Sequence, residues 1–153
     1  MAPNNELAEI AAQLLNDGGS GALATASAKH DGFPFASQSA FSVIPSQEDS
    51  SAKLPTPIFL FSDLSVHSKN LRKNPKATLL IQAGNEMQQS RVSIMGIIER
   101  LDEKLVDQAR QSYLVKHPDA AQWIKFGDFH LYAMSIVDCY VVAGFGKAGW
   151  IKQ

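Results

Sequence analysis

Short apolar segments, joined in most places by turns alone, are the feature of this sequence that most limits its fold. The segments predicted to form strands are 21–27, 33–44, 58–61, 77–81, 91–98, 129–136 and 140–145, and helices are expected over 6–15, 62–74 and 102–117. A doubly wound parallel sheet needs a helix after nearly every strand, and this chain does not supply them. The pattern therefore predicts a mainly β domain, a small antiparallel barrel of six or seven strands with helices in the connections.

Local signals set the expected ends of the helices. Asn4 or Asn5 is placed to cap the first helix, and the run Asp17–Gly19 ends it. Pro75 ends the second helix, because the residue before a proline avoids the helical region. Segment 45–57 contains three prolines and is expected to be an exposed loop.

Turn residues and alternation organise the expected strands. The run Lys29–Gly32 predicts a hairpin with a four-residue connection. Val137 and Asp138 are expected to separate the last two strands. Segment 91–98 alternates, which places Val92 and Ile94 on one side of its strand.

Charge and cysteine content exclude several classes of function. The chain has 14 Lys and Arg against 15 Asp and Glu, a net charge of −1, so no overall field attracts nucleic acid or anionic lipid. The single cysteine, Cys139, excludes an intrachain disulfide and a multi-cysteine metal site, and its apolar surroundings predict a buried thiol. The four histidines lack metal-ligand spacing, so no histidine-based metal site is expected.

Length and surface composition bear on organisation. The 153 residues, 45% of them hydrophobic, fit one domain over 1–153, with a helix in 1–17 and a barrel in 20–151. Charged residues make up only 19%, which hints that a second copy of the chain covers part of the surface. The amino terminus lacks the pattern of a signal peptide, and no apolar stretch approaches the roughly 18 residues of a membrane helix, so a cytoplasmic protein is expected.

The start of the second predicted helix is the strongest candidate for a binding site. A strand leads directly into the first turn of a helix there, where free N–H groups and the positive end of the helix dipole gather. Hydroxyl donors accompany them from Ser62, Ser65 and Ser68, and cationic or switchable donors from His67, Lys69 and Arg72. This set suits a phosphate group. The alternative is a serine-capped surface helix exposed to solvent.

The other chemical signals are weaker. Segment 144–150 combines three glycines with Lys147 and Trp150, and the indole could stack on a planar ring. No serine stands in a GxSxG nucleophile elbow, and the pair Asp102-Glu103 is better explained as a helix start than as an acid/base couple.

Three blocks of the chain, at 22–37, 61–75 and 126–148, together resemble the pyridoxamine 5′-phosphate oxidase-like, FMN-binding split-barrel superfamily. The closest branch contains the haem-utilisation proteins and their shorter relatives. The most specific match is Asn70-Leu71-x-x-Asn74-Pro75 before an apolar strand. The resemblance implies a six-stranded antiparallel split barrel of Greek-key character with flanking helices.

The resemblance also implies a cofactor and a partner. The family works as a homodimer with FMN at the interface. By position, Ser37, Gln38 and Ser39 would line the flavin ring and ribityl chain, and Arg91 would make a further polar contact. The phosphate would be held by Ser62, Ser65, His67, Ser68 and Lys69, and Lys147 and Trp150 complete the predicted cofactor-binding set. No catalytic residue is predicted.

Departures from the family's motifs argue against two of its activities. Members that oxidise pyridoxamine phosphate commonly have Arg-Lys where this chain has Val66-His67, and they carry a carboxyl-terminal Arg-x-His element that is absent here. A true pyridoxamine phosphate oxidase is therefore not expected. Haem-degrading relatives take an iron ligand from a longer carboxyl-terminal tail, so haem ligation here would need His67 or His130.

These inferences lead to one main hypothesis and three rivals. The main hypothesis is an FMN-dependent oxidoreductase of unassigned substrate, in which hydride passes to the flavin. The first rival is a haem-binding or haem-degrading protein on the same barrel. The second is a cofactor-free dimer used for binding, and the third is a protein that holds a deazaflavin in place of FMN.

Overall fold

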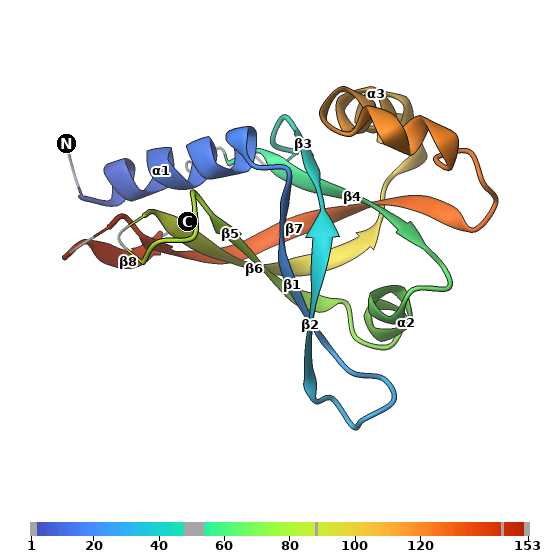
Figure 1. Cartoon of the computed structure of the whole chain (residues 1–153), viewed down its shortest axis with the longest axis horizontal. Helices are drawn as coiled ribbons and strands as arrows, with labels where there is room; N and C mark the ends of the chain where they lie inside the picture. The colour runs from blue at the N-terminus through green and yellow to red at the C-terminus, as the bar shows by residue number, and fades with distance from the viewer. Residues whose placement is uncertain (1–2, 48–53, 88, 145, 152–153) are drawn as a thin grey trace.

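The computed structural model describes residues 3–47, 54–87, 89–144 and 146–151 (Figure 1). Its helices are α1 (Pro3–Asp17), α2 (Val66–Lys73) and α3 (Val106–Lys116), with 3-10 turns η1 (Glu103–Leu105) and η2 (Pro118–Gln122). Its strands are β1 (Ser20–Ala26), β2 (Pro34–Ala40), β3 (Ser42–Ile44), β4 (Thr56–Ser62), β5 (Lys76–Gln82), β6 (Arg91–Arg100), β7 (Phe129–Val142) and β8 (Ala148–Ile151).

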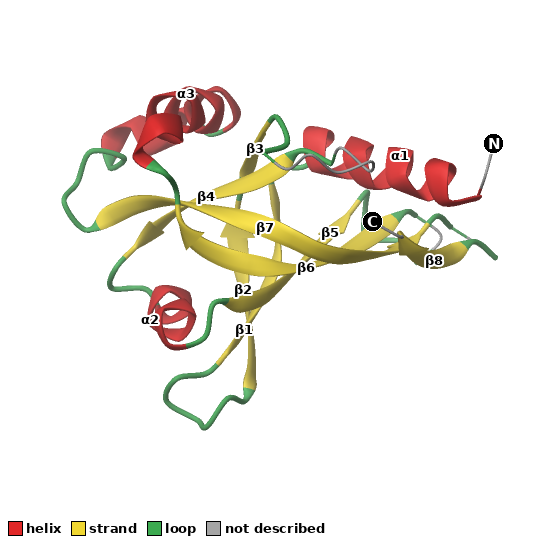
Figure 2. Ribbon diagram, turned by 180° about the vertical axis from the view of Figure 1, so that it is seen from behind, coloured by secondary structure: helices red, strands yellow, loops and turns green. Residues whose placement is uncertain are grey.

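The strands form one antiparallel sheet that curls on itself (Figure 2). The order across the sheet is β2-β1-β5-β6-β7-β4-β3, with β8 added beside β7. The strands at the two ends of this order, β2 and β3, are separated in the chain by Phe41 alone. The sheet must therefore bend round to bring its first and last strands together. The predicted mainly β fold, an antiparallel split barrel with flanking helices, is confirmed, but the described residues form eight strands where six were expected.

Alternating apolar residues fill the inside of the curled sheet. In β6, Val92, Ile94 and Ile98 are buried, as their alternation predicted. They join a core that also contains Leu15 of α1, Leu23, Phe41, Phe59, Leu79, Met134 and Val141. A second cluster packs α3 onto the sheet through Ile44, Ile58, Ala109, Tyr113 and Leu131.

The three helices of the described residues begin at other residues than the sequence predicted. Helix α3 starts at Val106, after the 3-10 turn η1 that Asp102 caps, and not at Asp102. Helix α1 starts at Pro3, so Asn4 and Asn5 lie inside its first turn and not at the position before it. Helix α2 starts at Val66, not at Ser62. The Ser65 side chain caps it by accepting the N–H of Ser68, and a turn precedes the cap.

The last part of the sheet differs most from the prediction. Residues 129–142 form one strand of 14 residues, not two strands around a turn. Asp138 pairs with Met95 and Ile136 pairs with Gly96, so Val137 is an unpaired bulge residue. A bulge accommodates one extra residue without ending the ladder. Strand β8 was not predicted, and Phe145, the expected end of the last strand, lies outside the described residues.

The β1–β2 connection and the segment 45–57 were each predicted in part. The β1–β2 hairpin forms, but its connection runs from Ser27 to Phe33 and is longer than four residues. It contains positive φ angles at Asp31 and Gly32. In the segment 45–57, Leu54 is buried and Thr56 already belongs to β4, while residues 48–53 lie outside the described part of the chain.

Cys139 is buried in β7, as predicted. Burial, with a smaller contribution from the charge of Asp138, raises the pKa of its thiol to about 12. The thiol therefore stays protonated at neutral pH and is not an activated nucleophile. Among the described residues, no helix is long and apolar enough to cross a membrane.

Candidate functional site

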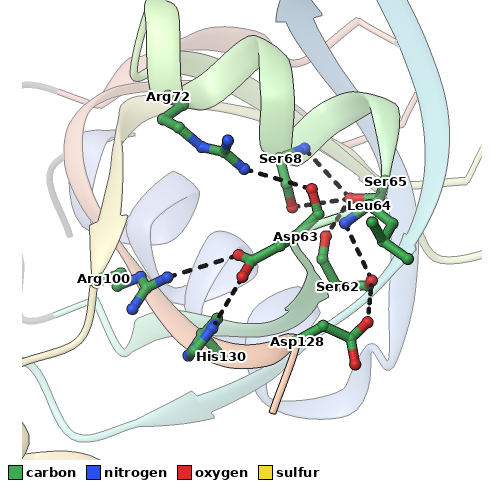
Figure 3. A network of polar contacts seen from close by, with 9 residues as sticks. All are labelled: Ser62, Asp63, Leu64, Ser65, Ser68, Arg72, Arg100, Asp128 and His130. Carbon is green, nitrogen blue, oxygen red and sulfur yellow. Dashed lines mark hydrogen bonds and ion pairs between the residues drawn. The ribbon is translucent and has the colours of Figure 1, made fainter. Parts of the chain in front are cut away.

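The start of α2 is built from three serines that bond to one another. Ser65 Oγ lies 2.8 Å from the carbonyl oxygen of Ser62 and 2.8 Å from Ser68 Oγ. Ser62 Oγ donates to Asp128 Oδ2 at 2.7 Å and accepts the N–H of Leu64 (Figure 3). The structure brings the three predicted hydroxyls together. Each of them already has a partner within the protein.

The two other predicted phosphate ligands on α2 do not join this cluster. The His67 ring packs against Phe61 with centroids 4.3 Å apart, and burial lowers the pKa of His67. This imidazole is therefore neutral at pH 7 and adds no charge for an anion. Lys69 is exposed. Because His67 adds no charge and Lys69 lies outside the serine cluster, the cationic part of the predicted phosphate site is weak.

Donors from three elements converge on Asp63, just before α2 (Figure 3). His130 Nε2 donates to its carboxylate at 3.1 Å, and Arg100 forms an ion pair with it at 3.5 Å. Arg72 Nη2 donates to the Asp63 carbonyl oxygen at 3.3 Å. Sequence reasoning named Arg72 among the donors of this helix but did not identify Asp63 or Arg100, because it is the β6–β7 pairing that brings Arg100 beside His130.

A buried asparagine fixes α2 against β1. Asn70 Nδ2 donates to Thr25 Oγ1 at 3.0 Å, and Asn70 Oδ1 accepts the N–H of Ala28 at 2.8 Å. Without Thr25 and Ala28, the buried amide nitrogen and oxygen of Asn70 would have no hydrogen-bond partner. The position of the helix is therefore specified by hydrogen bonds as well as by packing. Asn70 is part of the motif that carried the resemblance.

The predicted flavin contacts of β2 lie on opposite faces of the sheet. Ser37 and Ser39 share the inner face with buried Leu23 of β1. Ser37 Oγ is buried and has no hydrogen-bond partner among the described residues. Gln38 lies on the outer face and donates to Ser20 Oγ at 3.2 Å.

Three further predicted residues lie on or next to β8, which Figure 1 shows at the other end of the sheet from α2. Trp150 belongs to β8, Lys147 precedes it, and Arg91 pairs with Val142, which pairs with Ala148 of β8. Arg91 Nη1 donates to the Met87 carbonyl oxygen at 3.0 Å. Lys147 pairs with Glu6 of α1 at 3.0 Å. The half-exposed Trp150 packs against Tyr140 with ring centroids 5.1 Å apart. Within one chain, these residues and the α2 cluster do not form a single site.

An open apolar pocket of about 450 Å³ lies on the outer face of β1, β5 and β6. Its lining includes Ala24, Ala26, Pro34, Met95, Ile97 and Val137, with Lys76 as its charged residue. Small side chains on β1 leave this space because they fill so little of the outer face. The predicted site did not include this pocket, although the small residues at alternate positions of 22–26 were a signal for it.

The described residues contain no group of three or more His, Cys, Asp or Glu side chains that could hold a metal ion.

The family model described as "CREG, beta-barrel" matches residues 2–153 of this chain. A curated relative, the chloroplastic non-canonical heme oxygenase HOZ of Arabidopsis thaliana, is 38% identical over 117 residues. That match covers 76% of this chain and 34% of HOZ, so the chain spans about a third of the length of this relative.

Two solved structures show the same fold. A heme-binding protein from Mycobacterium smegmatis superposes with a TM-score of 0.81 at 24% identity, covering 94% of this chain and 57% of the other. A putative pyridoxamine 5′-phosphate oxidase from Listeria innocua has a TM-score of 0.62 at 15% identity, covering 89% of this chain and 98% of the other. Together with the family match, these structures confirm the predicted superfamily.

Proposed function

Because this chain belongs to the CREG β-barrel family and shares 38% of aligned residues with a haem oxygenase, we propose that its function is to bind haem. The observation that carries the proposal is this match over 76% of the chain. It favours the haem hypothesis over the FMN hypothesis, which was the main prediction from the sequence.

The outer pocket has the chemistry that a haem ring requires. Its walls are mostly apolar, which suits the flat porphyrin, and Lys76 is available for a porphyrin carboxylate. Haem brings four ring nitrogens to its iron, so the absence of a multi-residue metal cluster among the described residues is no obstacle. When bound, haem would supply a redox-active iron.

The residues that could complete the iron coordination lie in two places. In the pocket itself, Met95 offers a thioether, a known axial ligand of haem iron. His67 has the neutral imidazole that ligation needs, because burial lowers its pKa. It lies on α2 outside the lining of the outer pocket, so it would be the ligand of a haem bound beside α2. The ring of His130 is already bonded to Asp63, so His130 is the weaker of the two histidine candidates that the sequence suggested.

A haemin titration followed by absorbance tests the proposal. We expect a Soret band at about micromolar haemin, with a shift or loss of that band in Met95→Leu or in His67→Ala. Met95→Leu keeps the volume and removes only the sulfur. His130→Ala serves as a control because its ring bonds to Asp63. Wild-type protein that gives no Soret band with excess haemin would overturn the proposal.

FMN remains the second candidate, favoured by the hydroxyl-rich first turn of α2. On this hypothesis the protein is an FMN-dependent oxidoreductase, with Ser65 and Ser68 giving up their mutual bond to a phosphate. Titration of the same protein with FMN distinguishes the candidates, because bound flavin has bands near roughly 370 and 450 nm and no Soret band. A bound deazaflavin would lack the flavin band near roughly 450 nm. A cofactor-free dimer would bind neither haemin nor FMN nor a deazaflavin.

We further propose that the outer face of β1, β5 and β6 is where two copies of the chain meet, with the pocket at the interface. Val137 of the pocket lining is 58% exposed, so this face offers apolar surface to a second copy. Ile97→Asp should shift a dimer to a monomer in sedimentation velocity, because it places a charge at the centre of the face. Val115→Asp, on exposed α3, should leave the dimer unchanged. A monomeric wild-type protein would contradict this proposal.

A further inference from the structure

A second pocket, of about 330 Å³, lies between α2 and the end of β6, away from the outer pocket. It is lined by Ser68, Leu71, Arg72, Pro75, Ile98, Glu99, Arg100 and Tyr132. Ile98 faces the inside of the curled sheet, whereas its neighbour Ile97 lines the outer pocket. Because successive side chains of β6 point to opposite faces, the two pockets lie on opposite faces of the sheet.

Two guanidinium groups flank this second pocket and are poorly neutralised. Arg72 has no carboxylate within 4.0 Å among the described residues, and its recorded bond goes to a backbone carbonyl. Arg100 has one distant carboxylate partner, at 3.5 Å, and its side chain is 59% exposed. A guanidinium carries five N–H donors, so both groups retain donors for a ligand.

Neutral donors complete the lining. The Tyr132 ring is buried against Phe61, and its residue faces the same side of the sheet as Arg100, with which it pairs across β6 and β7. Ser68 adds a hydroxyl at the floor beside α2. Glu99 is the one carboxylate in the lining, against two arginines. The charge of the lining therefore favours an anion.

The contacts of Asp63 show what kind of group these donors bind. The Asp63 carboxylate pairs with Arg100 and accepts a hydrogen bond from His130, and the Asp63 carbonyl oxygen accepts one from Arg72 (Figure 3). The donors beside the pocket are thus directed at oxygen atoms. A second oxyanion in the pocket would share the two arginines with Asp63, and the Asp63 carboxylate would compete with it for Arg100.

From this geometry we propose that the pocket between α2 and β6 binds an oxyanion, the phosphate or carboxylate group of a small molecule, between Arg72 and Arg100. Guanidinium groups bind both kinds of oxyanion through paired, charge-assisted hydrogen bonds. The site is separate from the haem pocket on the outer face, and it uses none of the residues assigned to haem.

Calorimetric titration of the haem-free protein with inorganic phosphate, and separately with succinate, at constant ionic strength tests this proposal. Arg72→Gln and Arg100→Gln should each weaken binding of the preferred anion by about tenfold or more, since each removes a charge-assisted contact. Lys73→Gln is the matched control. It removes the same charge from the next residue of the same exposed helix end, outside the pocket lining, and should change the affinity less than about twofold.

Asp63→Asn separates a built site from general attraction to a basic surface. Removing the competing carboxylate should strengthen anion binding by several fold, and the gain should disappear when Arg100→Gln is added. Tighter binding of phosphate than of succinate would assign a phosphorylated ligand, and the reverse a carboxylate. No heat of binding for either anion, or an equal loss in Lys73→Gln, would overturn the proposal. Because haem is absent throughout, the result is independent of the haem titration.

Discussion

Phe41→Ala is expected to lower the free energy of unfolding by about 3–5 kcal/mol, the range for truncating a buried phenylalanine. Phe41 is completely buried, and it lies where the chain passes from β2 to β3. Its N–H bonds to the Gly19 carbonyl oxygen at 2.9 Å, and its own carbonyl accepts from His117 Nε2 at 2.7 Å. The backbone on both sides is held, so the core cannot move in to fill the cavity.

Urea unfolding, followed by circular dichroism, measures this effect through the midpoint of the transition. A loss of this size is a large part of the roughly 5–15 kcal/mol that stabilises a typical domain. Phe33→Ala is the matched control, because the same atoms are removed from a side chain that is 73% exposed. A loss below about 1 kcal/mol for Phe41→Ala, or an equal loss for Phe33→Ala, would show that the crossing between β2 and β3 is not a rigid point of the core.

The parts of the fold that the sequence predicted well are those encoded over a few residues. Alternating apolar side chains identified β6, and Pro75 marked the end of α2 because a proline restricts its predecessor. The fusion of 129–142 into one strand was not predictable in this way. Asp138 favours a turn locally, and its pairing with Met95 across the sheet overrides that preference.

In the candidate site, too, contacts between residues close in sequence were predictable and contacts between distant strands were not. Ser62, Ser65 and Ser68 come together because they lie within one helical turn and its approach, and their spacing was sufficient to predict this. The convergence of Arg100 and His130 on Asp63 depends on the register of β6 against β7, which no local pattern reports. The outer pocket likewise needs three strands side by side.

A cofactor cannot easily contact all of its predicted ligands within one chain, because the α2 cluster is separated from Arg91, Lys147 and Trp150. A ligand held by both groups would have to contact both ends of the sheet, or two different chains. The proposed dimer makes the second arrangement possible. Lys147 has a local role in this chain, because its bond to Glu6 joins α1 to the segment before β8.

The second large effect is expected from Gly21→Ala in β1. A Cβ atom at Gly21 would lie 2.3 Å from the carbonyl oxygen of Leu80, and 3.1 Å from Leu79 Cδ1. The nearest atom belongs to the backbone of β5, so no side chain can rotate away and the two strands must separate. Overpacking of this kind costs about 1–3 kcal/mol or more. The same strand pair carries Ala24 and Thr78, which line the outer pocket, so haemin affinity should fall together with stability.

Gly127→Ala is the matched control for this prediction. A Cβ atom at Gly127 would meet nothing within 4 Å, and its φ angle is not in the left-handed region. The alanine should be neutral there, or stabilising by about 0.4–1 kcal/mol, because it restricts the unfolded chain. The two substitutions add the same methyl group, so opposite shifts of the urea midpoint would isolate the contact between β1 and β5. Equal midpoints, with haemin binding retained in Gly21→Ala, would mean that these strands are not closely paired beside the outer pocket.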